Sequence, residues 1–436
     1  MRHFGNVIRP FNIEYSLLST LLIGIALRIA LAPYTSHVGD VQVYYIAILN
    51  MLNNIGMYET FYFTYPPLFS IILFPLFKIF SLFNQFSSLA IMQTSNPNLP
   101  ILITSPVFNI LLKTPIFMFD TLTGFLIYRF LHAIKNKNVA HRAFMLWYLN
   151  PLLIFIGAIN GQFDIIPTFF LFLAFILLYY RKYTLSGLSI GFGIAGKLFP
   201  FYFLFPYFAI IIKNEQKFFR KATSLIYFFL GLFFSLGIVF LPFLLTNTWQ
   251  DLLHSIFART TYISSLGGLN LFNIFYVPYF NFLMNLLNEA PVLVNQLLIV
   301  IEFIFVLIIS LNIFKVDISI KNLIFLHIRL LIIIYLLMFT TNPQYIIWIL
   351  PFLTVWHSFF NKDLSRILIL SICAIIFNLS WNFPFYPLIY YSKISGTSIV
   401  LMKDINYIIF SNFIVRATTG LIGVSILISF LRRDRN

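Results

Sequence analysis

Carboxylates are scarce in this chain. Only 13 of its 436 residues are Asp or Glu, and charged residues of both signs make up 9% of the sequence, whereas a typical soluble domain has about 25%. Cysteine is scarcer still, because Cys373 stands alone and so excludes an intrachain disulfide framework. No group of Cys and His residues has the spacing of metal ligands. These shortages exclude an ordinary soluble domain, a disulfide scaffold and a Cys/His metal-binding module.

Hydrophobic residues are what the chain has in excess. They make up 60% of the sequence, and the mean hydropathy is +0.92. Repeated apolar runs of about 18 residues or more are typical of transmembrane helices. We therefore predict an all-α polytopic membrane protein with about 11 to 13 membrane segments. No small-residue cleavage site follows the first run, residues 15–33, so we expect that run to remain as a signal anchor.

Basic residues outnumber acidic ones and give a formal charge of +15. Lys and Arg gather in the cytoplasmic loops of membrane proteins, and the sequence has no motif or long basic arm that would indicate nucleic-acid binding. We therefore place the basic clusters, and with them both termini, in the cytosol. These clusters are Arg2 and Arg9; Lys135, Lys137 and Arg142; Arg181 and Lys182; Lys213, Lys217, Arg220 and Lys221; Lys315 and Lys321; Lys362 and Arg366; and Arg432, Arg433 and Arg435.

The loops between those clusters then fall on the outer face. They are residues 34–66, 159–164, 246–270, 341–345 and 383–406. The first has no Lys or Arg, which agrees with an outer position. We expect interfacial helices within 34–66 and 246–292, and the stretch "VQVYYIAILNML" suits one of them.

Two stretches, residues 183–212 and 67–130, cannot be assigned as simple membrane-spanning helices. Residues 183–212 begin and end beside basic clusters, so we predict two short helices that meet at an outer-side break, "GKLFP" at 196–200. Between 67 and 130, either "YPPLFSIILFPLF" is re-entrant or residues 100–112 form a third short arm. No internal repeat is evident. We expect one membrane domain, 1–436, with a first half at 1–215 and a second half at 216–436.

The outer segments bring several polar side chains to one face of the membrane. Those with chemistry to offer are Asp40, Tyr65, Asp164, Lys197, His254, Arg259, Gln344 and Tyr345. A carboxylate can take a proton from an attacking hydroxyl, and a cation can stabilise a phosphate as it leaves. Together they suit glycosyl transfer from a lipid-phosphate sugar to an alcohol, with inversion of the anomeric carbon.

An ordered set of motifs carries a resemblance to a known family. The motifs are "GDVQVYY", "YPPL", "LLKTPIFMFDTLTGFLIYRF", "NPLLIFIGAINGQFD", "GKLFPFYFLFPY" and "NPQYIIWILPF". With them the chain resembles the membrane-integral GT-C glycosyltransferases. Within these it is most similar to the catalytic subunit of GPI mannosyltransferase I and related archaeal and bacterial enzymes that use polyprenyl-phosphate mannose. The resemblance runs through residues 15–215 and is thin in the later half.

The resemblance implies roles for two residues. Asp40, in the first outer loop, would be the catalytic base, and Lys197 of the Lys-aromatic-Pro motif would bind the donor phosphate. The family often has two acids one residue apart, but Val38 and Gln42 flank Asp40 at that spacing. One carboxylate is a poor metal site by itself. We therefore predict no certain cofactor and keep Mg or Mn at Asp40 as an alternative.

Asp40, Asp164 and Lys197 also have structural interpretations. Asp40 could cap the helix that follows it, and Asp164 could cap a helix at 165–180 instead of contacting a substrate hydroxyl. Lys197 could be a snorkelling lysine at the interface. His37 could assist Asp40 or face water.

The remaining candidates divide in the same way. Arg259 could bind phosphate or anchor its loop to lipid headgroups, and His254 could hydrogen-bond the phosphate or be structural. Tyr65 is a candidate substrate contact. Gln344 and Tyr345 could touch sugar, or they could cap and orient a helix.

Two acids, Asp120 and Glu302, lie within apolar runs. Acidic residues are costly inside a membrane and commonly mark function or pairing. The simplest expectation is an interhelical hydrogen bond for each, and proton-coupled transport is the alternative.

These observations predict a membrane glycosyltransferase, in the simplest case a mannosyltransferase. The resemblance implies a dolichyl or polyprenyl phosphate sugar as donor and a glycolipid or glycan as acceptor. It implies an active site on the outer face of an archaeal or bacterial plasma membrane, or on the luminal face of the endoplasmic reticulum. Membrane lipids are expected partners, nucleic acid is not, and a small partner subunit is kept as an option. The alternatives are another donor sugar, a protein acceptor, a flippase or transporter for lipid-linked sugars, and an inactive scaffold subunit.

Overall fold

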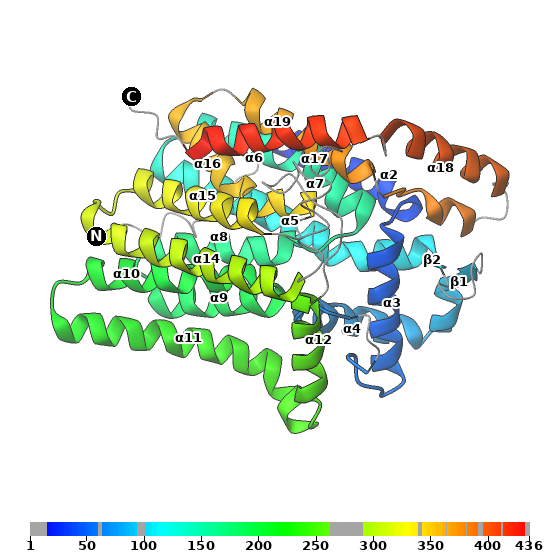
Figure 1. The fold of residues 1–436 in the computed structure, drawn as a ribbon, viewed down its shortest axis with the longest axis horizontal. Coiled ribbons are helices and arrows are strands. Elements are labelled where there is room, and N and C mark those ends of the chain that lie inside the picture. Colours follow the sequence, from blue (N-terminus) through cyan, green and yellow to red (C-terminus); the bar gives the residue numbers. More distant parts are fainter. Residues whose placement is uncertain are drawn as a thin grey trace.

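The computed structural model of the protein describes residues 15–59, 63–93, 101–261, 291–338, 342–362, 364–380, 382–390, 396–410 and 413–431. Helices make up nearly all of these residues (Figure 1). The α-helices of the first half are α2 (Tyr15–Leu31), α3 (Val38–Leu52), α4 (Leu68–Ser81), α5 (Pro106–Ile134), α6 (Lys137–Tyr148), α7 (Pro151–Leu153), α8 (Ile165–Tyr179), α9 (Tyr183–Gly196) and α10 (Leu204–Asn214). Those of the second half are α11 (Phe218–Leu245), α12 (Trp249–Thr261), α14 (Pro291–Asn312), α15 (Ile320–Leu337), α16 (Leu350–Phe360), α17 (Ser365–Leu379), α18 (Gly396–Phe410) and α19 (Phe413–Leu431).

Seven helices within the described residues are long and apolar enough to cross a membrane, which confirms a helical multi-pass membrane protein. These spans are Tyr15–Tyr34, Pro106–Ile134, Lys137–Asn160, Phe218–Leu245, Gln296–Lys315, Ile320–Leu337 and Ile414–Leu431. Shorter apolar helices are Val38–Leu52, Leu68–Ser81, Ile165–Tyr179, Phe199–Asn214 and Ser365–Leu379. Because helix length alone does not decide which of the shorter helices enter the bilayer, the predicted total of 11 to 13 segments stays a prediction.

A short β-hairpin departs from the all-α expectation. Strands β1 (Ala90–Gln93) and β2 (Ile101–Thr104) pair antiparallel, with Ala90 opposite Thr104. The hairpin lies beside α3, and the side chain of Gln42 accepts a hydrogen bond from the backbone N–H of Leu102 at 3.2 Å. Strands of four residues carry too little periodicity to be recognised in a sequence this apolar.

The structure decides between the two readings of residues 67–130. Residues 106–112 belong to the 29-residue helix α5, so they form no separate arm. Helix α4 has 14 residues, which spans about 21 Å and is short of a bilayer core of about 30 Å. The third short arm is therefore excluded, and the re-entrant alternative for residues 65–77 is the prediction that remains.

The predicted break at 196–200 is present. Helix α9 ends at Gly196, Lys197 is extended, and the 3₁₀ helix η4 (Phe199–Phe203) leads into α10. Helix α9 packs tightly on α11, since a Cβ atom on Gly187 would lie 1.9 Å from the carbonyl oxygen of Phe228. A Cβ on Gly231 would meet the carbonyl of Thr184 at the same distance.

Several of the basic loops meet at one end of the bundle. The ammonium of Lys135 lies 4.8 Å from the centre of the Phe359 ring, and Arg142 donates to the side chain of Asn361 at 3.2 Å. Lys213 donates to the carbonyl of Ile313 at 2.7 Å, which joins the α10–α11 turn to the α14–α15 turn. The sequence-based placement of these clusters on one face is therefore consistent with the packing.

Helices α3 and α12 run across the direction of the long helices (Figure 1). This crosswise orientation is the one expected of helices that lie in a membrane interface. Both fall where interfacial helices were predicted, within 34–66 and 246–292. The predicted outer loop 383–406 is instead partly helical, because it contains a 3₁₀ turn at Tyr386–Tyr390 and most of α18.

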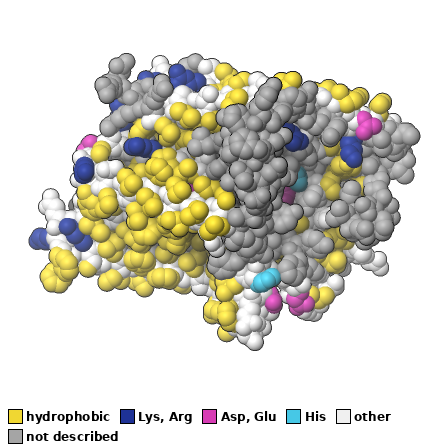
Figure 2. All heavy atoms as spheres, viewed as in Figure 1, with side chains coloured by type: hydrophobic (Ala, Val, Ile, Leu, Met, Phe, Trp, Pro, Cys, Tyr) yellow, Lys and Arg dark blue, Asp and Glu magenta, His cyan; other side chains and the backbone are white. Residues whose placement is uncertain are grey.

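Exposed apolar side chains cover a broad area of the surface over α11 and α14 (Figure 2). They include Leu230, Phe233 and Phe234 on α11, and Val300 and Ile304 on α14. An apolar surface of this extent is unfavourable in water and suits contact with lipid.

Candidate active site

The segment "NGQFD" turns sharply between two helices. Its first residue, Asn160, is the last of the π-helix Ile154–Asn160, and Gly161 caps the end of that helix with a φ of 77°. Only glycine adopts this left-handed conformation at little cost, and π-helical turns occur often at functional sites. The turn contains Gln162 and Asp164, and α8 begins directly after it at Ile165.

Asp164 and Lys197 form a buried ion pair. The Lys197 Nζ donates to the Asp164 Oδ1 at 2.6 Å, and the indole Nε1 of Trp348 donates to the same oxygen at 2.9 Å. Asp164 is completely buried, and Lys197 is 6% exposed. Asp164 occupies the N-cap position of α8, but its side chain makes no capping hydrogen bond. Capping is therefore not its role in this fold.

Aromatic rings enclose the Lys197 ammonium. The Nζ atom lies 4.7 Å from the centre of the Tyr345 ring, 5.1 Å from Phe163 and 5.5 Å from Tyr65. At these distances the ring faces attract a cation. The predicted residues Tyr65, Asp164, Lys197 and Tyr345 therefore meet in one cluster, although the chain separates them widely.

The Tyr65 ring is fixed through its own backbone. The hydroxyl of Tyr58 donates to the carbonyl of Tyr65 at 2.7 Å. Burial raises the pKa of Tyr58 above its usual value, so the phenol stays protonated and keeps donating.

Asp40 lies beside the cluster and is more accessible. Its Oδ2 accepts a hydrogen bond from the side-chain amide of Gln162, and its side chain is 24% exposed. The Nδ1 of His37 lies 3.1 Å from the same oxygen and 3.2 Å from the backbone nitrogen of Asp40. A protonated Nδ1 donates to the carboxylate, whereas an unprotonated one accepts from the backbone and caps α3. His37, and not Asp40, is the N-cap residue of α3.

Three buried polar atoms near this cluster have no hydrogen-bond partner among the described residues. They are the Oε1 of Gln162, the Oδ2 of Asp164 and the Nε2 of Gln344. Unsatisfied buried polar groups are costly and call for a bound water or a ligand. Gln344 and Tyr345 belong to the 3₁₀ helix η8 (Pro343–Trp348), and Tyr345 stacks on Trp348 with ring centres 4.3 Å apart.

The structure does not bring His254 to Lys197. His254 is exposed on α12, and the contacts of Lys197 within the described residues are Asp164 and the aromatic rings. Arg259 is also on α12, but its side chain lies outside the described residues. Their predicted roles in phosphate binding stay predictions.

The described residues contain no group of three or more His, Cys, Asp and Glu side chains that could hold a metal ion. Where the structure describes the surroundings of Asp40, its one ion-pair partner is His37. Magnesium or manganese at Asp40 therefore stays a hypothesis based on sequence.

Sequence reasoning missed several residues that shape the site. Gln162 and Trp348 stand inside motifs that were singled out, but nothing in their spacing showed that they contact Asp40 and Asp164. Lys113 was also missed, although it is a lone cation in an apolar run. It is fully buried and donates to the carbonyls of Ala32, Thr35 and Ala158.

The two acids in apolar runs form the interhelical hydrogen bonds that were expected. Asp120 on α5 accepts from Arg28 of α2 at 2.5 Å and from the Trp147 indole at 2.9 Å. Arg28 also donates to the carbonyl of Tyr148 at 2.9 Å. Glu302 on α14 accepts from the Tyr202 hydroxyl of η4.

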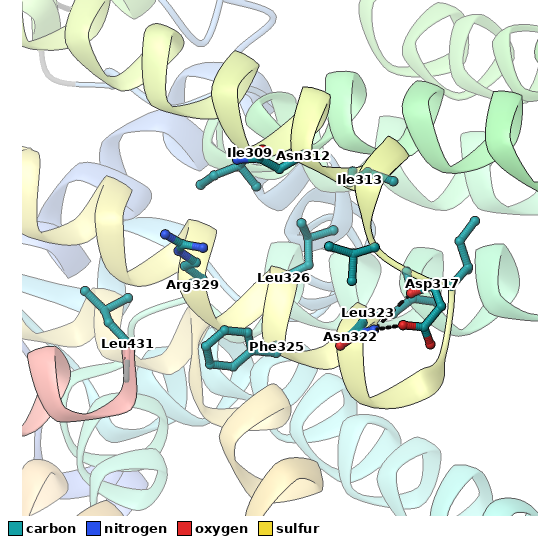
Figure 3. Close-up of a pocket in the computed structure, with 12 residues that line it drawn as sticks. Ile309, Asn312, Ile313, Asp317, Asn322, Leu323, Phe325, Leu326, Arg329 and Leu431 are labelled. Carbon is teal, nitrogen blue, oxygen red and sulfur yellow. Dashed lines mark hydrogen bonds between the residues drawn. The ribbon is translucent and has the colours of Figure 1, made fainter. Parts of the chain in front are cut away.

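A cavity of about 220 Å³ lies elsewhere, near the basic turn between α14 and α15 (Figure 3). Its wall is mostly aliphatic, with Arg329 at one side and Asn322 at the other. Asn322 donates to Asp317 at 2.7 Å. None of the predicted site residues lines this cavity, so it is separate from the candidate active site.

No family model matches the chain, and no curated protein matches it.

Proposed function

We propose that the protein is an inverting glycosyltransferase that moves a sugar from a dolichyl or polyprenyl phosphate to a hydroxyl group on a glycolipid or glycan. Mannose is the sugar that the family resemblance favours. The observation that carries the proposal is the position of Asp40. Its carboxylate is accessible and is held by Gln162, two residues from Asp164, which pairs with Lys197.

In the proposed reaction Asp40 takes the proton of the acceptor hydroxyl. The hydroxyl oxygen attacks the anomeric carbon from the side opposite the phosphate, and a new glycosidic bond forms. The bond between the anomeric carbon and the phosphate oxygen breaks, and its electron pair stays on the phosphate. Inversion follows from this single displacement.

Lys197 is the proposed partner of the departing phosphate. One of its three N–H groups donates to Asp164, and no second hydrogen-bond acceptor for it lies among the described residues. A phosphate oxygen could take one of the remaining donors, since a charge-assisted hydrogen bond to phosphate is strong. Because Lys197 is almost fully buried, the enclosing rings must move apart to admit the phosphate.

The test is transfer by the purified protein in lipid nanodiscs. With polyprenyl-phosphate mannose and a glycolipid acceptor fraction, Asp40→Asn should lower the transfer rate by about 100- to 10,000-fold, while donor binding stays the same. Glu59→Gln is the matched control, because Glu59 is an exposed acid of the same outer region. Full transfer by an Asp40→Asn protein that binds donor would refute the role of Asp40. Replacing the donor with other lipid-phosphate sugars identifies the sugar.

A flippase or transporter for lipid-linked sugars is a second candidate. It is favoured by the buried ion pairs Arg28–Asp120 and Asp164–Lys197, because ionisable groups inside membranes often mark transport paths. Proteoliposomes distinguish the two candidates. A transporter moves labelled lipid-linked sugar across the bilayer without making a new glycosidic bond.

A further inference from the structure

Lys113 is a buried cation that has no carboxylate partner in the part of the chain that the structure describes. It lies on α5 and is fully buried. Its ammonium donates to the carbonyls of Thr35 at 2.5 Å, Ala158 at 2.8 Å and Ala32 at 2.9 Å, with that of Ile159 at 3.3 Å. Within the described residues no carboxylate contacts it. An ammonium has three donors, so these carbonyls use its full capacity.

The carbonyls belong to two segments that lie at helix ends. Ala32 and Thr35 follow α2, and Ala158 and Ile159 close the π-helix Ile154–Asn160. Carbonyls in the last turn of a helix have no partner within the helix and carry partial negative charge. The ammonium therefore provides hydrogen-bond donors to carbonyls of both segments, 32–35 and 158–159, and holds the two segments together.

Both segments lead directly into the candidate active site. Thr35 precedes His37, the N-cap of α3, and Ile159 precedes the turn that carries Gln162. Beyond Lys113 the two chains touch again, because the N–H of His37 donates to the carbonyl of Asn160 at 2.9 Å. The next contact along them is the one between Asp40 and Gln162.

The packing around Lys113 leaves little freedom. A Cβ atom on Gly161 would lie 3.0 Å from the Cε of Lys113. Asn109, one turn earlier on α5, donates to the carbonyl of Pro33 at 3.1 Å and fixes the same segment. Two side chains one turn apart on α5, those of Asn109 and Lys113, thus bind the chain between α2 and α3.

We infer that Lys113 is a positioning residue for Asp40: its ammonium clamps residues 32–35 to residues 158–159 and so keeps the Asp40 carboxylate against Gln162. The part of this inference that concerns catalysis rests on the proposed function, whereas the clamp itself does not.

The test compares Lys113→Met with the wild-type protein in nanodiscs by hydrogen–deuterium exchange. Exchange should rise by about tenfold or more in residues 35–42 and 158–164 and should stay the same in α11 and α14. In the transfer assay kcat should fall by about 100-fold, as expected for a small misplacement of a reacting group, while KM for the donor changes little. Lys78→Met is the matched control, since Lys78 is exposed on α4 and should leave both readouts unchanged.

Each outcome decides a separate claim. Unchanged exchange in both segments overturns the clamp. Raised exchange with unchanged kcat overturns the positioning role. If wild-type protein transfers no sugar from any donor, the proposed function fails, and exchange still decides the clamp. If Lys113→Met is not monodisperse, Lys113→Arg takes its place; its planar fork cannot converge on three carbonyls, so exchange should rise in the same two segments.

Discussion

At the residue scale, the pairing of Asp164 with Lys197 is the central feature of the site. A buried ion pair adds little net stability, but removing one partner leaves an uncompensated charge. The rings around Lys197 offset part of that cost, because a cation–π contact contributes about 2 kcal/mol or more when the cation is desolvated. Each member of the pair therefore depends on the other.

We predict that Asp164→Leu destabilises the protein by about 3 to 5 kcal/mol, and that Lys197→Met does the same. The double variant Asp164→Leu/Lys197→Met should lose much less than the sum, because no buried charge is left alone. Thermal unfolding midpoints in detergent measure all three. Additive losses in the double variant would contradict a direct interaction between the two side chains.

The sequence predicted which single residues are candidates for the site, but it did not predict which residues they contact. Scarcity identified Asp40, Asp164 and Lys197 as candidates, because an isolated charge in an apolar chain requires a reason. Their hydrogen-bond partners could not be predicted, because Gln162 is 122 positions from Asp40 and Lys197 is 33 positions from Asp164. Contacts of that range depend on how helices pack, and local spacing does not report it.

At the scale of elements, the contact between α9 and α11 depends on glycine. A side chain on Gly187 or Gly231 would collide with backbone of the facing helix. Close approach of helices through small residues is a common mode of packing in membranes. Because Lys197 directly follows Gly196, the last residue of α9, this contact also helps to fix the position of the cation.

Substituting alanine should therefore give opposite results at two glycines. Gly187→Ala forces α9 away from α11 and should cost about 1 to 3 kcal/mol or more. Gly237→Ala on the same α11 has nothing within 4 Å of its new Cβ and should gain up to about 1 kcal/mol from helix propensity. Unfolding midpoints of the two variants provide the comparison, and a stable Gly187→Ala protein would show that the helices can separate without loss.

The ends of helices were predictable where glycine or proline interrupts the apolar sequence. Gly196 and Pro200 predicted the break between α9 and η4, and residues 34–66 contain a helix, α3, where an interfacial helix was predicted. The π-helix before Gly161 was not foreseen, because its composition is that of any apolar helix. The hairpin was missed because strands of four residues carry too little periodicity to be recognised.

At the scale of the whole molecule, the arrangement of charge predicts orientation. The basic turns that meet at one end of the bundle should face the cytosol. Within α5, Lys113 binds the carbonyl of Thr35 in the segment predicted to be outer, and the helix continues from there to Ile134 beside Lys135. The candidate active site therefore belongs at the end opposite the basic turns.

Cysteine labelling in intact cells tests this orientation. In a Cys373→Ser background, Asn53→Cys at the end of α3 should react with a membrane-impermeant maleimide, and Asn138→Cys should react only after the cells are permeabilised. Both positions are exposed, so access from each side should decide the reaction. The reverse pattern would place Asp40 in the cytosol and would remove the basis for an outer-face enzyme.

The ion pair between Arg28 and Asp120 has a consequence for biogenesis. The two residues lie 92 positions apart, and synthesis at roughly 5 to 20 residues per second separates their emergence by about 5 to 20 s. During that interval α2 carries an arginine with no counter-charge, which costs about 2.5 to 3.5 kcal/mol at the centre of a membrane helix on insertion scales. Helix α2 gains its counter-charge only once α5 arrives, so we expect the insertion machinery to retain α2 until α5, the second of the long spans, has been made.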